Sequence, residues 1–177
     1  WSPGDDRENV TMAELCELFT VDKVHSSPAR FDMKKLEAIN GDKIRALTLD
    51  EFLKWSLPFL TKAGVITGTD AEIVLVKKAL PIIQERIVKL DEVPAMLRFL
   101  FVKEFAVEEA SLSKVTDAAS KEVLKRSLAE LKPLTVWNHD SIEAALRISL
   151  IEELGLKPRI AFGAVRIATT GSTISPP

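Results

Sequence analysis

Apolar residues recur at spacings of three and four along almost all of this 177-residue chain. That spacing places apolar side chains on one face of an α-helix, whereas a half-buried strand would need them at every second position. Two Thr-x-x-Glu capping boxes, which begin at Thr48 and Thr69, mark helix starts. The β-branched run at residues 73–76 follows the second box and continues on a helical period. The pattern therefore predicts an all-α fold with two packed helical lobes.

Glycine, proline and capping side chains divide this pattern into segments. Asp32 and Asp140 are predicted N-caps, and Gly41 and Gly155 are predicted to lie just beyond helix ends. A break with two glycines is expected at residues 64–69. The predicted helices span residues 12–19, 33–39, 48 to Pro58 or slightly past, 69 onward with a kink or restart at Pro81, 94–101, 120–131, 141–154 and 161–171.

Composition limits the class of protein. Apolar residues make up 46% of the chain, which is enough for a packed core. The net charge of −2 argues against nucleic-acid binding as a property of the whole chain. No apolar run approaches the roughly 18 residues of a membrane span. The single cysteine, Cys16, cannot form an intramolecular disulfide, so we expect a reducing, cytoplasmic setting. We interpret Cys16 as a small apolar core residue rather than a reactive thiol.

Motifs for catalysis or metal binding are not found in the sequence. His25 and His139 are far apart and belong to no Cys/His cluster, so we predict surface or capping positions for them. The chain has no phosphate-loop, dinucleotide-binding or Gly-x-Ser-x-Gly motif. The acidic pairs at residues 5–6 and 108–109 are interpreted as solvated surface. We therefore expect no catalytic, cofactor or metal site within this chain.

One stretch differs in charge from the rest of the chain. Residues 156–177 contain no acidic residue, but they include Lys157, Arg159 and Arg166. Arginines and hydroxyl groups without competing carboxylates suit a polyanion or exposed bases. Composition alone favours a basic helix end followed by a flexible polar tail over such a binding site.

Three passages resemble the bacterial-type glutamyl-tRNA synthetases. Residues 28–36 read Pro-Ala-Arg-Phe-Asp-Met-Lys-Lys-Leu and continue through Asn40-Gly41, which resembles the Phe-Asp-x-x-Lys-Leu-x-x-x-Asn segment of that family. The preceding Trp-Ser-Pro and Asp-Arg-Glu of residues 1–8 resemble its lead-in. Leu-Lys-Pro-Arg at 156–159, Val-Arg-Ile-Ala-Thr-Thr-Gly at 165–171 and the final Ser-Pro-Pro resemble its C-terminal block. Their order and spacing fit over nearly the whole chain.

The resemblance implies a division into domains. Residues 1–47 would be the end of a stem-contact domain, and residues 48–107 and 108–177 would be two helical anticodon-binding lobes, the second without its final helix. The family's His-x-Gly-His-type and Lys-Met-Ser-Lys-Ser-type motifs are missing, and residues 111–114 echo the second only superficially. We expect both ends to be cuts in a longer protein. ATP and magnesium would act in the absent catalytic domain, and this fragment should be inactive alone.

The resemblance also implies RNA contacts. Arg86 would face the third anticodon base, a cytosine, because a guanidinium is a donor fork that suits the carbonyl oxygen and ring nitrogen of an unpaired cytosine. Arg166, Ser175 and Pro176 would contact the anticodon loop, with Ser175 in place of the family's threonine. Candidate contacts to the tRNA backbone, for which an exposed helix face is the alternative, are Lys34, Lys35, Arg45, Lys157 and Arg159.

The implied whole protein is a monomer that ligates glutamate to tRNA-Glu using ATP. Two alternatives stay open. A nondiscriminating enzyme would also charge tRNA-Gln; Arg86 weighs against it, because glutamine at this position is associated in the family with relaxed choice. A helical protein-interaction module without an RNA role would suit the negative net charge.

Overall fold

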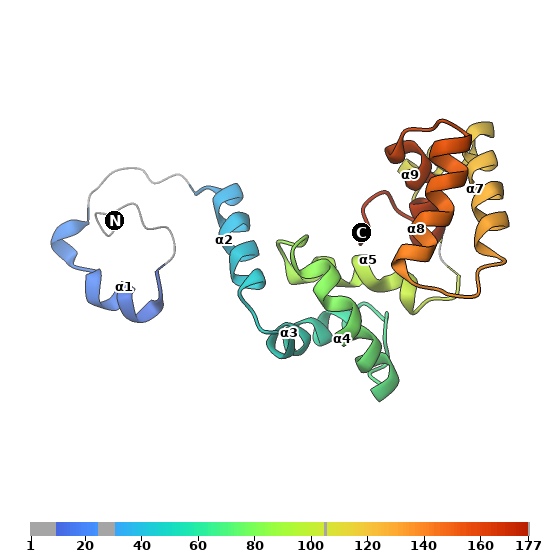
Figure 1. Ribbon diagram of the computed structural model, residues 1–177. Helices are drawn as coiled ribbons and strands as arrows, with labels where there is room; N and C mark the ends of the chain where they lie inside the picture. Colours follow the sequence, from blue (N-terminus) through green and yellow to red (C-terminus); the bar gives the residue numbers. More distant parts are fainter. Residues whose placement is uncertain (1–9, 25–30, 105, 177) are drawn as a thin grey trace. The chain divides into compact units, whose positions relative to one another are not determined.

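The computed structural model describes residues 10–24, 31–104 and 106–176. Within these ranges every regular element is a helix (Figure 1), so the predicted all-α class is confirmed. The lead-in at residues 1–8 with its acidic pair, His25, residues 28–30 and Pro177 lie outside the described residues. No helix in the described ranges is both long and apolar enough to cross a membrane.

The helices are short to medium in length and are joined by brief turns. In chain order they are α1 (Met12–Leu18), η1 (Val21–Lys23), α2 (Met33–Arg45), α3 (Leu49–Lys62), α4 (Asp70–Gln84), η2 (Leu90–Glu92), α5 (Val93–Leu97), η3 (Arg98–Leu100), α6 (Glu109–Thr116), α7 (Ala118–Leu131), α8 (His139–Arg147), η4 (Ile148–Glu153) and α9 (Pro158–Thr170). The η4 segment is a π-helix, and the other η segments are 3-10 turns.

The chain forms two compact units. The first consists of residues 1–62 and 68–93, and the second of residues 63–67 and 94–177. Each unit is described below by itself. This division does not test the domain boundaries predicted after residues 47 and 107, which stay predictions.

Side chains cap the helix starts as predicted. The Glu72 carboxylate accepts the Thr69 backbone N–H at 2.8 Å, and the Thr69 hydroxyl accepts the Glu72 N–H at 3.4 Å. Thr48 and Glu51 form the same reciprocal pair, at 2.9 and 3.3 Å. The Thr48 hydroxyl and backbone N–H lower the pKa of Glu51 by hydrogen bonding. Both predicted capping boxes are confirmed, and Thr11 forms a further one at the start of α1.

Two predicted helix boundaries are wrong. Gly41 lies inside α2, which continues to Arg45, because glycine tolerates helical torsions as well as turn torsions. Asn138, not Asp140, caps α8, because the Asn138 side-chain oxygen accepts the Ser141 N–H at 2.9 Å. The predicted cap at Asp32 is confirmed at the start of α2.

Turn and proline positions follow the sequence signals in part. Gly64, Gly68 and Gly155 have positive φ angles of 65°, 95° and 65°, so each breaks a helical path where a break was expected. Helix α4 continues through Pro81 to Gln84, so no restart occurs there. The predicted helix at 141–154 is α8 followed by the π-helical η4.

Apolar stripes on the helices form a core in each unit. The first unit buries Phe52 and Leu60 of α3 against α4, whose Val76, Leu80 and Ile83 are fully covered. The second unit packs Val123 of α7 with these buried residues of α8, η4 and α9: Leu146, Leu150, Ala161 and Ala164. Such helix-on-helix burial is the source of stability that the apolar period predicts.

Helix α1 does not contribute to these cores. It has no buried residue, and Cys16 is exposed. The prediction that Cys16 is a core residue is therefore wrong. A seven-residue helix has too few turns for its apolar positions to be covered on the strength of pattern alone.

Ser56 of α3 provides a test of the first core. Its hydroxyl is fully buried and has no hydrogen-bond partner among the residues that the structure describes. An unsatisfied buried hydroxyl costs about 1–3 kcal/mol, so we expect Ser56→Ala to raise the free energy of unfolding by about 1 kcal/mol. Urea unfolding followed by circular dichroism measures this change.

Ser127 of α7 is the matched control. It is also buried, but its hydroxyl donates to the Val123 carbonyl at 2.7 Å. Ser127→Ala should therefore leave stability unchanged or lower it. A Ser56→Ala variant less stable than wild type would show that the hydroxyl is satisfied in solution.

Candidate nucleic-acid interface

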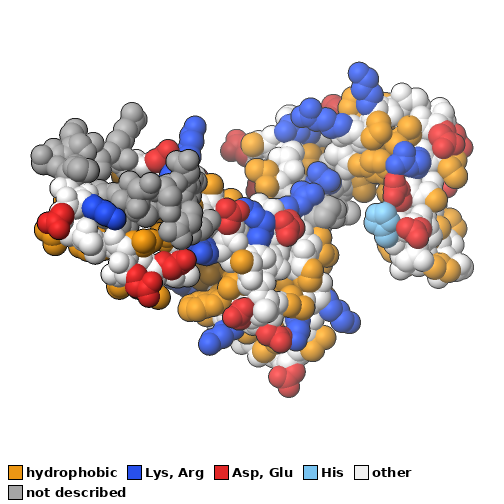
Figure 2. All heavy atoms as spheres, turned by 60° about the vertical axis from the view of Figure 1, so that its left-hand side comes forward, with side chains coloured by type: hydrophobic (Ala, Val, Ile, Leu, Met, Phe, Trp, Pro, Cys, Tyr) orange, Lys and Arg blue, Asp and Glu red, His pale blue; other side chains and the backbone are white. Residues whose placement is uncertain are grey.

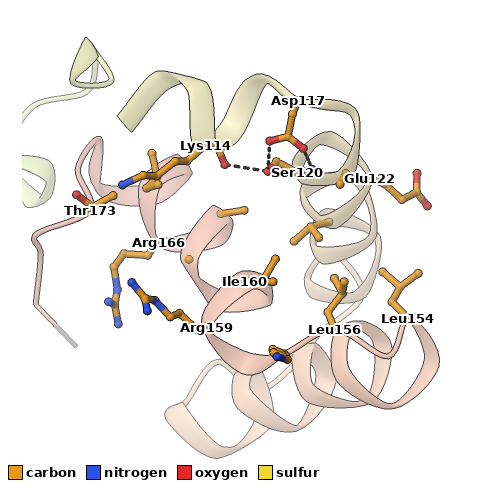
Figure 3. A pocket seen from close by; sticks show the side chains of 16 residues that line it. Lys114, Asp117, Ser120, Glu122, Leu154, Leu156, Arg159, Ile160, Arg166 and Thr173 are labelled. Carbon is orange, nitrogen blue, oxygen red and sulfur yellow. Dashed lines mark hydrogen bonds between the residues drawn. The ribbon is translucent and has the colours of Figure 1, made fainter. Parts of the chain in front are cut away.

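The second unit contains a pocket of about 960 Å³ that is lined by side chains from several elements. Figure 3 shows these side chains from close by. They come from the end of α6, the first half of α7, the turn after η4, helix α9 and the segment that follows α9. The residues that matter below are Lys114, Asp117, Glu122, Lys157, Arg159 and Arg166.

Helix α9 presents two arginines on one face. Arg159 and Arg166 are seven residues apart, which is about two helical turns, so their side chains leave the same side of the helix. In Figure 3 both guanidinium groups extend outward on that side. The opposite face is covered, because Ala161, Ala164 and Ile167 are buried. The apolar period of α9 therefore determines where its cations point.

Both ends of α9 are defined by local chemistry. Pro158 is the first helical residue, where its fixed φ suits a helix start. Gly171 ends the helix with a φ of 79°. Its carbonyl accepts the Glu108 N–H at 2.9 Å, and the Glu108 carboxylate accepts the Ser172 hydroxyl at 2.7 Å. These bonds hold the chain after α9 against the start of α6.

The pocket has an excess of positive charge. It is lined by four cations, Lys114, Lys157, Arg159 and Arg166, and by two carboxylates. No ion pair or side-chain hydrogen bond of these cations is recorded among the described residues. Their charges are therefore available to an anionic ligand.

The two carboxylates of the pocket are engaged elsewhere. Asp117 accepts the Ser120 backbone N–H at 2.9 Å and the Ser120 hydroxyl at 2.7 Å, and these bonds hold the pKa of Asp117 below its usual value. Glu122 accepts a hydrogen bond from Arg126 at 3.2 Å. Neither carboxylate forms an ion pair with the four cations, so these cations are not occupied by the carboxylates of the pocket.

Lys114 was missed by the sequence analysis. It lies in α6, more than forty positions before α9, in a segment that shows no excess of basic residues. Only the packing of α6 and α7 against α9 brings its side chain to the pocket. On the face drawn in Figure 2, basic and acidic side chains are interspersed, in keeping with a net charge of −2.

Arg86 lies in the first unit, directly after α4. Its backbone N–H donates to the Ile83 carbonyl at 2.9 Å, and its side chain is exposed. The next residue, Ile87, is fully buried. No partner of the Arg86 guanidinium is recorded in the described ranges. The position therefore combines an anchored backbone with an accessible donor group.

The remaining predicted residues differ in accessibility. Lys34 and Lys35 are exposed in the first turn of α2, while Arg45 is half-buried and pairs with Asp42 at 2.5 Å.

Ser175 and Pro176 are buried, and the Ser175 hydroxyl donates to the Pro176 carbonyl at 3.2 Å. They would have to be uncovered to touch a base. Their role in binding stays a prediction.

The structure thus brings together only part of the predicted set. Lys157, Arg159 and Arg166 share the pocket of the second unit, with Lys114 as an additional member. Arg86, Lys34, Lys35 and Arg45 belong to the first unit. His139 is exposed at the start of α8, as predicted, and Glu108 and Glu109 are exposed too. No three potential metal-ligating side chains gather in the described part of the chain.

Comparison with known proteins gives consistent results. Residues 43–177 match the sequence model of the family described as "Anticodon binding domain". A glutamate–tRNA ligase of Saccharopolyspora erythraea is 42% identical over 180 residues, which are 100% of this chain and 36% of the relative. A glutamate–tRNA ligase of Leifsonia xyli is 41% identical over 182 residues, covering 37% of its length. The chain therefore spans little more than a third of these curated relatives.

A solved structure shares the fold. The crystal structure of a glutamate tRNA ligase from Elizabethkingia meningosepticum superposes with a TM-score of 0.73 at 20% sequence identity. The match covers 99% of this chain and 34% of the other. At this identity the similarity supports the all-helical architecture and no more.

The Asp117 cap beside the pocket gives a pH-dependent prediction. Because the pKa of Asp117 is lowered in the folded state, its stabilisation is complete above the ordinary value of 3.8 and is lost as the pH falls through the lower folded-state value. We expect Asp117→Ala to lower the thermal unfolding midpoint at neutral pH, with a difference from wild type that shrinks below 3.8.

Thermal scans over a pH series measure this difference. Glu130→Ala is the control, because Glu130 is exposed on α7 and makes no hydrogen bond or ion pair with the described residues. An Asp117→Ala difference that stays constant down to the acid limit would contradict the assignment.

Proposed function

We propose that this chain is the anticodon-binding region of a glutamate–tRNA ligase. The premise is established: the chain belongs to the anticodon-binding domain family. The observation that carries this proposal is the family match over residues 43–177. Glutamate–tRNA ligases that are 41–42% identical over the whole chain support it. The partner would be tRNA-Glu, bound through its anticodon arm.

The two units would contribute different contacts. The pocket cations Lys114, Arg159 and Arg166 suit phosphate oxygens, because neutralising phosphates releases counterions whatever the base sequence. Arg86, with an exposed donor fork on an anchored turn, suits the edge of an unpaired cytosine. Backbone contacts would hold the RNA, and base contacts would supply the choice of tRNA.

Chemistry would take place outside this chain. The sequence contains neither the His-x-Gly-His-type nor the Lys-Met-Ser-Lys-Ser-type motif. In the proposed ligase, ATP and magnesium would therefore act in a separate catalytic region, and the chain by itself would be inactive. We also propose that the whole enzyme is cytoplasmic and monomeric, as the resemblance to glutamyl-tRNA synthetases implies.

Two alternatives are distinguished by simple assays. The family match does not favour a protein-interaction module, which would show no salt-dependent binding of an anticodon stem–loop. A nondiscriminating ligase would charge tRNA-Gln as well as tRNA-Glu. An assay of tRNA-Glu and tRNA-Gln charging by the full-length protein distinguishes the two ligases. The presence of Arg86 favours the discriminating one, which would charge tRNA-Glu alone.

The assignment of Arg86 predicts a change in base choice. We expect Arg86→Gln to cost about 1–3 kcal/mol of discrimination between cytosine and guanine at the third anticodon position. A glutamine amide can both donate and accept, so it no longer disfavours the guanine edge. Aminoacylation of tRNA-Glu and its third-base variant by the full-length protein measures this discrimination.

Arg147→Gln is the matched control, because its guanidinium is engaged by Glu143 at 2.5 Å. It should leave the preference unchanged. An unchanged preference in Arg86→Gln would remove the role given to Arg86.

The pocket predicts a different kind of effect. Arg159→Gln should weaken binding of an anticodon stem–loop about equally for every third base and reduce the salt slope of the binding constant by about 1. Fluorescence anisotropy over a series of salt concentrations measures both quantities. Lys125→Gln is the control, because Lys125 is exposed on α7 but does not line the pocket. Loss for one third base only would show that Arg159 reads a base.

A further inference from the structure

The turn that carries Arg86 is fastened to α2 on its far side. The Asn40 amide donates to the Val88 carbonyl, and the Lys89 ammonium pairs with Glu37 at 3.3 Å. Asn40 and Glu37 are neighbours on α2, three residues apart, so both bonds hold the same two-residue stretch of the turn. These contacts join parts of the chain that are about fifty positions apart in sequence.

The near side of the turn is fastened to α2 as well. Gln84, the last residue of α4, donates through its side-chain amide to the carbonyls of Ile44 and Leu47, at 2.9 Å each. The Ile44 carbonyl also accepts the Leu47 N–H at 3.1 Å, so the Gln84 amide adds a second bond to the turn that ends α2. Ile87 is fully buried between the two attachments. The backbone of Arg86 is thus tied to α2 before and after it.

Gly41 allows this close approach. A Cβ atom at Gly41 would lie 3.1 Å from a Val88 side-chain carbon and 3.2 Å from the Arg45 guanidinium. Contacts at that distance require the neighbours to shift. A glycine within α2 therefore lets the turn lie directly against the helix, where the Asn40 amide can reach its carbonyl.

We propose that α2 positions Arg86 for base recognition, with Asn40 as a positioning residue and Gly41 as the site of close approach. This inference rests on the proposed function of Arg86. A phosphate contact tolerates displacement because charge attraction falls off slowly with distance. A two-pronged hydrogen bond to one base edge does not, because it needs the donor fork in place to within a fraction of an ångström.

Asn40 has features that separate positioning from simple stability. The residue is exposed, so its loss uncovers little apolar surface, and water can replace the amide at the Val88 carbonyl. Removing it should therefore loosen the turn more than it destabilises the unit. The discrimination between third bases is then the sensitive readout, rather than the yield of folded protein.

The test uses Asn40→Ala and Asn40→Asp in the full-length protein that contains this chain. Asn40→Asp keeps the size of the side chain but removes its N–H donors. We expect each variant to reduce third-base discrimination, measured as the ratio of kcat/KM for tRNA-Glu with cytosine or guanine, by about three- to tenfold. Hydrogen–deuterium exchange of residues 84–89 should become faster in both.

A double variant checks the coupling. If Asn40 acts through Arg86, then adding Asn40→Ala to Arg86→Gln should reduce discrimination no further than Arg86→Gln alone. Asn138→Ala is the matched control, because Asn138 also makes a structural side-chain bond, as the cap of α8. We expect it to leave discrimination and the exchange of residues 84–89 at wild-type values.

The outcomes separate this inference from the proposed function. If Arg86→Gln lowers discrimination while both Asn40 variants keep it at the wild-type ratio, the positioning role is overturned and the role of Arg86 stands. If Arg86→Gln itself has no effect, both fail. If the Asn40 variants lower the unfolding midpoint much more than Asn138→Ala and slow charging of both tRNAs equally, Asn40 is only structural and the inference is overturned.

Discussion

Helix ends leave backbone N–H and carbonyl groups without helical partners, and the order of this protein depends on how side chains satisfy them. Threonine, aspartate and asparagine cap the starts of most longer helices. Side-chain and backbone donors also reach carbonyls at helix C-termini, as Gln84 does at the end of α2 and the Glu108 N–H does at Gly171. These bonds join elements that are distant in sequence. They add defined contacts to the apolar cores that hold each of the two units together.

The residues proposed to meet RNA lie beside such junctions. Arg86 follows the last turn of α4, two residues after Gln84, and Arg166 lies in the last two turns of α9, close to the Gly171 end. At a helix end, hydrogen bonds hold the backbone in place while the side chain can extend into solvent. This arrangement suits recognition, because the scaffold is ordered before the ligand arrives and less ordering entropy is lost on binding.

Net charge proved a poor guide to local charge. The chain carries −2 overall, yet the pocket of the second unit gathers four cations whose neighbouring carboxylates are held by Ser120 and Arg126. The acid-free stretch at 156–177 indicated three of these cations from sequence. Lys114 could not be predicted, because its place in the pocket depends on how α6 packs against α9. Hydrogen bonding that occupies a carboxylate is likewise invisible in a count of residues.

The sequence by itself determined the helical class, the capping boxes at Thr48 and Thr69, the cap at Asp32 and the glycine breaks, because these depend on residues within a few positions of one another. Tertiary structure decided that Gly41 lies within a helix, that Cys16 is exposed, that Ser175 is covered and that Asn40 meets Val88. Each of these outcomes depends on which face of a helix another segment covers. Local propensity does not encode that choice; it follows from burying apolar stripes against distant partners.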